Sequence, residues 1–214
     1  MMLRAFVLLI GLLLGPAIAH GATIVVYGDS LSSGYGLSQS EGWVSRLAQR
    51  LREERLDYTV VNASVTGETT VGGVQRIDGV LRKNRPAIVI LELGANDGLR
   101  GQSIEAMERN LDTIVSACRK ARARVVLIGM HLPPNYGMGY TEKFHQAYVR
   151  LAKARNLPFV PFLLEGFAEN RALFQPDAFH PAAQAQPLIL DTVWPVLRPL
   201  LGKSVKSHPR PERR

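Results

Sequence analysis

The sequence has only one cysteine, Cys118, among 214 residues. A single thiol cannot close an internal disulfide, so the chain is not a small disulfide-stabilised scaffold. Cys118 recurs with apolar residues at helical spacing within residues 103–121, which predicts a thiol packed in the core rather than a nucleophile. No cluster of His, Cys and acidic residues has the spacing of a metal site, and we expect neither a metal nor a cofactor.

Long hydrophobic runs are also missing. The longest stretch, Ala5 to Ala19, has fifteen uncharged and mostly apolar residues, whereas a transmembrane helix needs about 20. Ala17-Ile18-Ala19 has the small-x-small pattern that signal peptidase accepts, so residues 1–19 are predicted to be a secretory signal peptide. The mature protein is then periplasmic or secreted. An uncleaved anchor or a core helix is the alternative, which Pro16 disfavours.

Repeats, low-complexity stretches and internal linkers are absent from residues 22–201. The length suits one domain, which we predict over residues 20–201. Residues 202–214 hold five basic residues and one acid, which predicts a solvated, disordered tail; weak attraction to an anionic membrane surface is the alternative. Without this tail and Arg4, the net charge falls from +8 to +3. We therefore expect no nucleic-acid partner. We also expect the protein to be a monomer.

Five short apolar runs alternate with amphipathic segments in the domain. The runs span residues 23–28, 58–62, 87–93, 124–130 and 158–162, and the helical patterns span 42–54, 71–83, 103–121, 141–156 and 182–200. This alternation predicts a parallel sheet with helices on both faces. Parallel strands end at one edge of the sheet, where ligands bind, so the segments that follow the strands are expected to carry the chemistry.

Polar, glycine-containing segments follow three of the runs. They are Gly28-Asp29-Ser30-Leu31, residues 62–69 and residues 94–98, and Asp177-Ala178-Phe179-His180 precedes the last helical pattern. Each segment alone is compatible with turn or capping chemistry. Together, at one edge, they predict a shared site.

Ser30, His180 and Asp177 have the residue types that nucleophilic acyl transfer needs. Ser30 follows the first strand and is the candidate nucleophile. Of the five histidines, His180 has an acid three residues earlier, so one turn can bring the Asp177 carboxylate to Nδ1 and leave Nε2 facing Ser30. For the other four histidines we expect structural or solvent roles.

The oxyanion that forms in acyl transfer needs hydrogen-bond donors. The backbone N–H groups of Gly67 and Ser30 and the side-chain amide of Asn96 are the candidates. Asp97 is expected to bond within its own loop. Asp29 is expected to point away from the nucleophile and to have no chemical role.

Five further residues in the loops at this edge are candidates to line an acyl groove. They are Leu31, Leu99, Leu132, Pro133 and Tyr136. The alternative is that they only anchor their loops.

These blocks, in this order, resemble those of the SGNH (GDSL) hydrolase superfamily. The resemblance covers nearly all of residues 22–201. Residues 62–70, 91–101 and 132–137 are similar, more narrowly, to the bacterial periplasmic group of acyl-CoA thioesterase I, protease I and lysophospholipase L1. The basic extension after residue 201 is not part of the family pattern.

The resemblance implies a three-layer α/β/α, flavodoxin-like fold with a five-stranded parallel sheet. It also implies a Ser-His-Asp triad of Ser30, His180 and Asp177, with Ser30, Gly67 and Asn96 lining the oxyanion hole. The implied substrates are aryl and acyl esters, acyl thioesters and lysophospholipids.

Two other functions remain open from the sequence. A flavodoxin-like module could cradle a phosphate with residues 28–34, although this leaves Asp177 and His180 unexplained. A carbohydrate acetylesterase could use the same fold. An α/β-hydrolase is not expected, because the segment around Ser30 lacks the second glycine of the G-x-S-x-G motif.

Overall fold

The structure is a computed structural model that describes residues 21–202. The predicted signal peptide and almost all of the predicted tail lie outside these residues. Within the described range, no helix has both the length and the apolar character needed to cross a membrane.

Five parallel strands form one sheet in the order β2-β1-β3-β4-β5. The strands are β1 (Ala22–Gly28), β2 (Tyr58–Asn62), β3 (Ile88–Glu92), β4 (Arg124–Ile128) and β5 (Phe159–Val160). The parallel sheet confirms the predicted fold class. β5 is shorter than the predicted run 158–162 because Pro158 and Pro161 flank it and cannot donate hydrogen bonds to a neighbouring strand.

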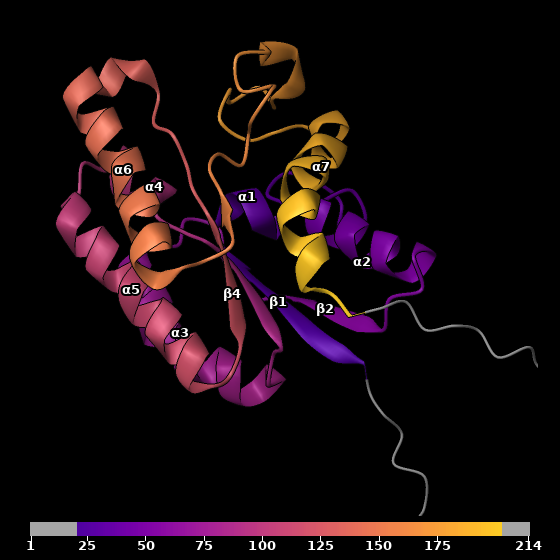
Figure 1. Ribbon diagram of the computed structural model, residues 1–214. Coiled ribbons are helices and arrows are strands. Elements are labelled where there is room, and N and C mark those ends of the chain that lie inside the picture. The colour runs from indigo at the N-terminus through magenta and orange to yellow at the C-terminus, as the bar shows by residue number, and fades with distance from the viewer. Residues whose placement is uncertain (1–20, 203–214) are drawn as a thin grey trace, which may run out of the picture.

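Helices cover both faces of the sheet (Figure 1). One face carries α3 (Thr70–Asn84), α5 (Ile104–Lys120) and α6 (Met138–Arg155), and the other carries α2 (Trp43–Glu53) and α7 (Gln186–Leu197). This arrangement is the three-layer architecture that the sequence predicts.

Shorter helices connect these layers. They are α1 (Ser30–Ser33), α4 (Ala95–Leu99) and the 3-10 turns η1 (Pro134–Tyr136), η2 (Arg171–Leu173), η3 (Ala183–Ala185) and η4 (Arg198–Leu200). The sequence does not predict α1 or α4, because a single turn shows no apolar periodicity. The predicted helix 182–200 is divided into η3, α7 and η4, with Pro187 in the first turn of α7 and Pro199 in η4; Pro195 lies inside α7, which continues to Leu197.

α5 shows how the sequence determines these helices. Ser103 caps its N-terminus by accepting a hydrogen bond from the N–H of Ala106. Its buried face consists of Ile104, Met107, Leu111, Ile114, Val115 and Cys118. Cys118 is fully buried, which confirms the predicted core thiol.

Two glycines allow the central strands to end close together. A Cβ on Gly28 would lie only 2.8 Å from the backbone oxygen of Glu92. Gly94 has a φ of +116° and lies against the Tyr148 hydroxyl. The segments that carry Ser30 and Asn96 therefore leave the sheet side by side.

Candidate active site

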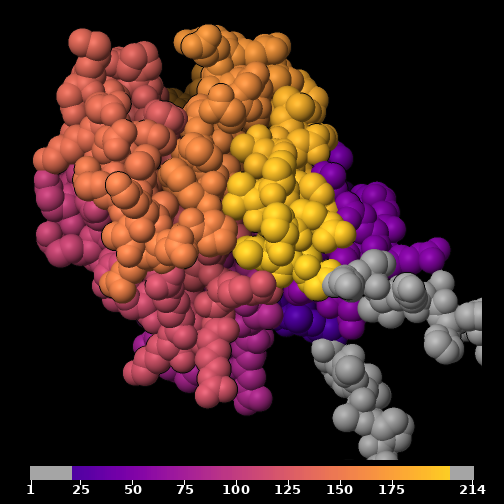
Figure 2. All heavy atoms as spheres, viewed as in Figure 1, coloured from indigo at the N-terminus to yellow at the C-terminus, as the bar shows by residue number. Residues whose placement is uncertain are grey.

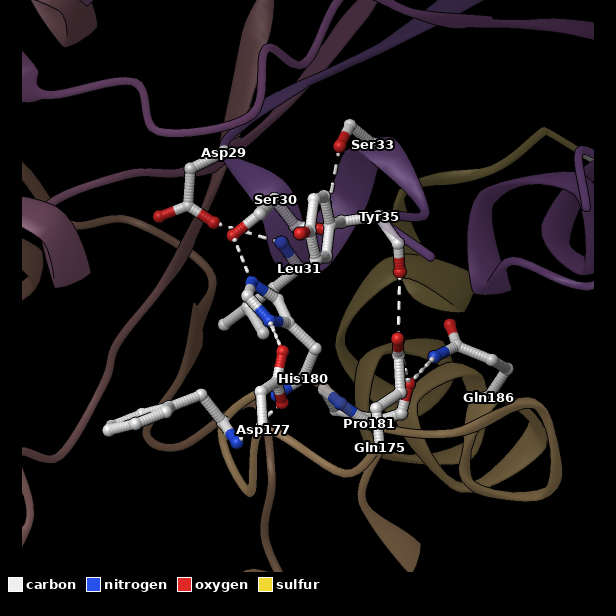
Figure 3. A network of polar contacts seen from close by, with 11 residues as sticks. Asp29, Ser30, Leu31, Ser33, Tyr35, Gln175, Asp177, His180, Pro181 and Gln186 are labelled. Carbon is white, nitrogen blue, oxygen red and sulfur yellow. Dashed lines mark hydrogen bonds and ion pairs between the residues drawn. The ribbon is translucent and has the colours of Figure 1, made fainter. Parts of the chain in front are cut away.

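Ser30, His180 and Asp177 form a chain of hydrogen bonds at the edge where the strands end (Figure 3). Ser30 Oγ lies 2.9 Å from Nε2 of His180. Nδ1 of the same imidazole lies 2.6 Å from Oδ2 of Asp177. The structure thus brings together a hydroxyl, a base and a carboxylate in the arrangement that activates a serine.

The Asp177 carboxylate is held by its own turn. Its Oδ1 accepts hydrogen bonds from the backbone N–H groups of Phe179, at 2.9 Å, and His180, at 3.0 Å. Partial burial raises the pKa of Asp177, but the hydrogen bonds from the His180 backbone and imidazole and from Phe179 outweigh it and lower the pKa to about 2. The carboxylate is therefore ionised, and it favours the tautomer in which Nδ1 donates to Asp177 and Nε2 accepts from Ser30.

The turn that carries His180 is tied to the segment that follows Ser30. Nε2 of Gln175 donates to the carbonyl oxygens of Tyr35, at 2.8 Å, and of Pro181, at 3.3 Å. The ring of Tyr35 lies 4.5 Å from the His180 imidazole, centroid to centroid. Figure 3 shows Gln175 between the two segments. Gln175 and Tyr35 were not predicted from the sequence, because a glutamine and a tyrosine in loops have no motif of their own.

The backbone N–H of Gly67 is available as a donor. Gly67 has a φ of +77°, and in the described part of the chain its N–H has no acceptor. The carbonyl oxygen of Gly67, which belongs to the following peptide unit, accepts a hydrogen bond from Nη2 of Arg100 at 3.1 Å. This bond restrains the residue from the side away from its N–H.

The Asn96 side chain forms hydrogen bonds to residues that lie next to the other two candidate donors, Ser30 and Gly67. Its Nδ2 donates to Oδ2 of Asp29, at 3.1 Å, and to the carbonyl oxygen of Glu68, at 3.0 Å. Asp29 directly precedes Ser30, and Glu68 directly follows Gly67. Both N–H groups of the amide are therefore in use, so donation to an oxyanion requires one of these bonds to be exchanged.

Contrary to the sequence-based expectation, the Asp29 side chain does not point away from the site but accepts a hydrogen bond from the candidate oxyanion donor Asn96. This contact positions Asn96, and no chemical role is assigned to Asp29. Its carboxylate is 1% exposed, caps α1 by accepting from the N–H of Leu31 at 3.0 Å, and orients Asn96. The chain turns into α1 directly after Asp29, so the alternation of the strand does not continue and cannot direct the side chain away. Burial raises the pKa of Asp29 to about 6, against the lowering effect of the hydrogen bond from Leu31.

Glu92 is a second buried carboxyl group beside the nucleophile, and the sequence analysis gave it no role. Its Oε2 accepts from Ser32 Oγ, at 2.7 Å, and from the N–H of Asp29, at 3.3 Å. Burial and the neighbouring Asp29 raise the pKa of Glu92 well above its ordinary value. A glutamate inside an otherwise apolar strand run was the available signal, because an acid there is buried.

Asp97 is structural, but the expectation that it bonds its own loop is wrong. Its carboxylate accepts from the N–H of Thr70, at 2.9 Å, and from Thr70 Oγ1, at 2.6 Å. This pair attaches the segment of Asn96 to the start of α3, close to Gly67. The predicted loop bond fails because Thr70, far away in sequence, offers two donors to one carboxylate.

The five residues predicted to line an acyl groove differ in how exposed their side chains are. Tyr136 and Leu99 lie together, because the Tyr136 hydroxyl donates to the Leu99 carbonyl oxygen at 3.0 Å. Tyr136 is exposed and Pro133 half-buried, whereas Leu31 and Leu132 are buried in the core. Figure 2 shows the molecule hollowed on its upper side, between the start of α6 and the segment that follows β5.

Two of the remaining histidines pack against each other. The rings of His131 and His145 are stacked with centroids 3.9 Å apart, and Phe162 contacts His131 edge-on. Burial, together with His145, lowers the pKa of His131. In residues 21–202, no group of three or more His, Cys and acidic side chains is placed to hold a metal ion.

Comparison with known proteins agrees with this geometry. Residues 26–187 match the GDSL-like Lipase/Acylhydrolase family. Esterase TesA of Pseudomonas aeruginosa is 45% identical over 183 residues, which cover 86% of this chain and 91% of that protein. Thioesterase 1/protease 1/lysophospholipase L1 of Escherichia coli K12 is 37% identical over 184 residues, covering 86% and 87%.

A solved structure is also similar. The psychrotrophic esterase EstA from Pseudoalteromonas sp., in a structure inhibited by monoethylphosphonate, has a TM-score of 0.80 and 38% identity, covering 83% of this chain and 97% of that one. The family match covers most of the chain and includes Ser30, Gly67, Asn96, Asp177 and His180. The chain belongs to the GDSL-like lipase/acylhydrolase family.

Proposed function

We propose that the protein hydrolyses carboxylic esters and acyl thioesters through an acyl-enzyme on Ser30. The hydrolase class is shown by the family and by the relatives named as esterases and thioesterases, and it confirms the sequence-based prediction. The hydrogen-bond chain from Ser30 through His180 to Asp177 is the observation that supports the mechanism. It also gives Ser30 Oγ a basic partner, which a phosphate cradle does not need.

In the first step, Nε2 of His180 takes the proton of Ser30 Oγ as this oxygen attacks the acyl carbonyl carbon. Asp177 stabilises the imidazolium that forms. The negative charge on the carbonyl oxygen is held by the N–H groups of Ser30 and Gly67 and by the Asn96 amide, after one of its bonds is exchanged. One such donor contributes about 2.7–4 kcal/mol to the stability of the transition state.

In the second step, the imidazolium returns its proton to the leaving alkoxide or thiolate as the bond to the acyl carbon breaks. Water then attacks the acyl-enzyme, with Nε2 of His180 again accepting a proton, and Ser30 Oγ leaves as a hydroxyl. The carboxylic acid and the alcohol or thiol are the products. We propose that Leu99, Pro133 and Tyr136 contact the acyl chain of the substrate.

Turnover of a p-nitrophenyl ester and of an acyl thioester tests the function. Ser30→Ala is expected to lower kcat by at least about 10⁴-fold on both substrates, because the nucleophile is lost. Ser45→Ala is the matched control, since the Ser45 hydroxyl on α2 donates to the Gln39 carbonyl oxygen and, within residues 21–202, has no hydrogen bond to the site. Retained turnover in Ser30→Ala would remove this residue from the mechanism.

We further propose that residues 1–19 direct export and that the mature protein acts as a monomer in the periplasm or outside the cell. The apolar stretch and the Ala17-Ile18-Ala19 pattern support this. Edman sequencing of the protein from a periplasmic extract tests it, with His20 expected as the first residue. An intact N-terminus in the cytosolic fraction would contradict export.

A further inference from the structure

Eight basic side chains are exposed at the edge of the sheet where the strands begin, at the opposite end from Ser30. They are Arg82, Lys83, Arg85, Arg119, Lys120, Arg122, Arg124 and Lys153, here called the basic rim. They come from the C-terminal ends of α3, α5 and α6 and from the first residue of β4. In Figure 1 the last turns of α3 and α5 and the start of β4 lie together at the lower end of the molecule.

The rim is continuous from α3 to α6. α3 packs on α5, and α5 packs on α6. Nη2 of Arg119 donates to the carbonyl oxygen of Arg155, which joins the ends of α5 and α6. Arg124 pairs in register with Ile88, and Ile88 with Ile24, so the rim lies level with the first residues of the central strands.

The charges of the rim are not neutralised by neighbours. Residues 79–91, 113–141 and 143–164, which contain all eight, have no acid. Within the described part of the chain, none of the eight forms an ion pair, whereas nearby Arg155 does, with Asp112. Basic residues are common at helix C-termini, but here three adjacent helix ends and a strand contribute to one field.

This arrangement polarises the molecule. Residues 20–201 carry a net charge of +3, so the part outside the eight rim residues carries −5. The catalytic edge and the basic rim are separated by the length of β1, about 20 Å for a strand of seven residues. An anionic surface would therefore attract the rim more strongly than the rest of the protein.

We propose that the basic rim docks the protein on an anionic phospholipid surface, with the catalytic edge turned toward solution. The exposed large apolar residues are Tyr35, Val65, Val71, Tyr136, Met138, Phe179 and Leu188, and none belongs to the rim. The rim thus offers no aromatic ring on which bases could stack, and no side chain that would enter hydrocarbon. The composition of the rim therefore fits contact with charged lipid headgroups and no insertion into the membrane.

The position of the chain ends supports the same orientation. The N–H of Gly202 donates to the Tyr58 hydroxyl at 3.0 Å, at the start of β2. The described chain therefore ends at the same edge of the sheet as the rim, and the sequence that follows Gly202 contains five more basic residues.

Binding to vesicles tests the proposal with the mature chain, residues 20–214. Phosphatidylcholine vesicles with and without phosphatidylglycerol are sedimented at low and high salt. Binding is expected only with phosphatidylglycerol and is expected to disappear at high salt, because headgroup attraction is screened. The double variant Arg122→Glu/Arg124→Glu is expected to weaken binding at least tenfold.

Arg109→Glu/Arg171→Glu is the matched control, because it makes the same charge change at exposed residues outside the rim. An equal loss in both double variants would show that only net charge matters and would overturn the proposal. So would loss of binding on deletion of residues 203–214 while the rim variant binds normally. Binding of double-stranded DNA that depends on the rim, without vesicle binding, would identify a nucleic acid as the partner instead.

A turnover assay tests the proposed orientation of the protein on the membrane separately. Vesicle-bound protein is expected to turn over a small soluble ester at the rate of the free protein, since Ser30 faces away from the surface. A several-fold loss of turnover on binding would contradict the proposed orientation. This measurement does not depend on which natural ester Ser30 attacks.

Discussion

At the scale of single residues, the Asn96 amide controls whether a ligand-free site can receive an oxyanion. Its two N–H groups bind a carboxylate and a carbonyl. These bonds hold the amide in one orientation before substrate arrives, which is the preorganisation that makes such donors effective. Asp29 supplies the charged acceptor and is a positioning residue.

Substitution of Asp29 by asparagine tests this positioning. Whichever way the new amide is turned, it faces either Asn96 or the Leu31 N–H with a donor, so one of the two bonds is lost. Asp29→Asn is expected to lower kcat by about tenfold or more with little change in KM, because substrate binding does not use the oxyanion donors. A changed KM with an unchanged kcat, or a melting temperature far below that of the wild type, would contradict a positioning role.

Activity is expected to fall at low pH. Only neutral His180 accepts the Ser30 proton, so protonation of the imidazole at low pH removes the base. The pKa of Asp177 is lowered to about 2, so this carboxylate remains charged throughout. Asp29 has a pKa raised to about 6 and gains a proton as the pH falls through that value, so it is a second group that can lower activity at low pH.

The kcat/KM profile of Asp29→Asn separates the two groups. If protonation of His180 causes the loss of activity at low pH, the variant loses activity over the same pH range as the wild type. If kcat/KM of the variant does not change with pH, protonation of Asp29 causes the loss of activity instead.

At the scale of elements, the site depends on how the turn of Asp177 and His180 is held against α1. Both segments are short and lie at the surface. Gln175 donates to both of them, and the Tyr35 ring packs on the imidazole. Without this connection, the 2.9 Å contact between Ser30 and His180 would be the main direct polar bond between the two segments.

Gln175→Ala is therefore expected to lower kcat by about tenfold and to slow labelling of Ser30 by a fluorophosphonate to a similar degree. Gln184→Ala is the control, because Gln184 donates from the same region to the Ala172 carbonyl oxygen and does not reach the Ser30 segment. Equal effects of the two substitutions would show a general loss of packing rather than positioning of His180.

The long elements and the triad geometry follow from local sequence patterns, and the supporting contacts do not. Five strand runs and the helical periodicities predict the sheet, and Asp177 lies three residues from its partner. Gln175 and Glu92 act through residues that are distant in sequence, and α1 is too short to show periodicity. The hydrogen-bond partners of Asp29 and Asp97 were not predicted, because Asn96 and Thr70 come from segments that are distant in sequence.

At the scale of the whole molecule, the described core ends at Leu201, which is 8% exposed and packs in the hydrophobic core. Deletion of residues 203–214 is expected to leave the melting temperature and the turnover of soluble esters unchanged. Deletion from Leu201 onward is the contrasting variant and is expected to lower the melting temperature, because it removes a buried leucine. A large destabilisation by the shorter deletion would show that the tail contributes to the core.

The charge distribution is the property of the whole molecule that sequence reasoning described least well. A net charge of +3 for the body gives no reason to expect a docking surface. The fold collects eight basic residues from separate helix ends at one edge of the sheet, so that the rest of residues 20–201 has a formal net charge of −5. Only the topology shows which charges are neighbours.

Ser30 is proposed to be the nucleophile of an acyl-transfer site. Mass spectrometry of the protein after reaction with a fluorophosphonate, followed by peptide mapping, tests it most directly. We expect one phosphonyl adduct per chain, located on Ser30, absent in Ser30→Ala and formed far more slowly in His180→Ala. An adduct on another residue, or an equal rate without His180, would contradict the account.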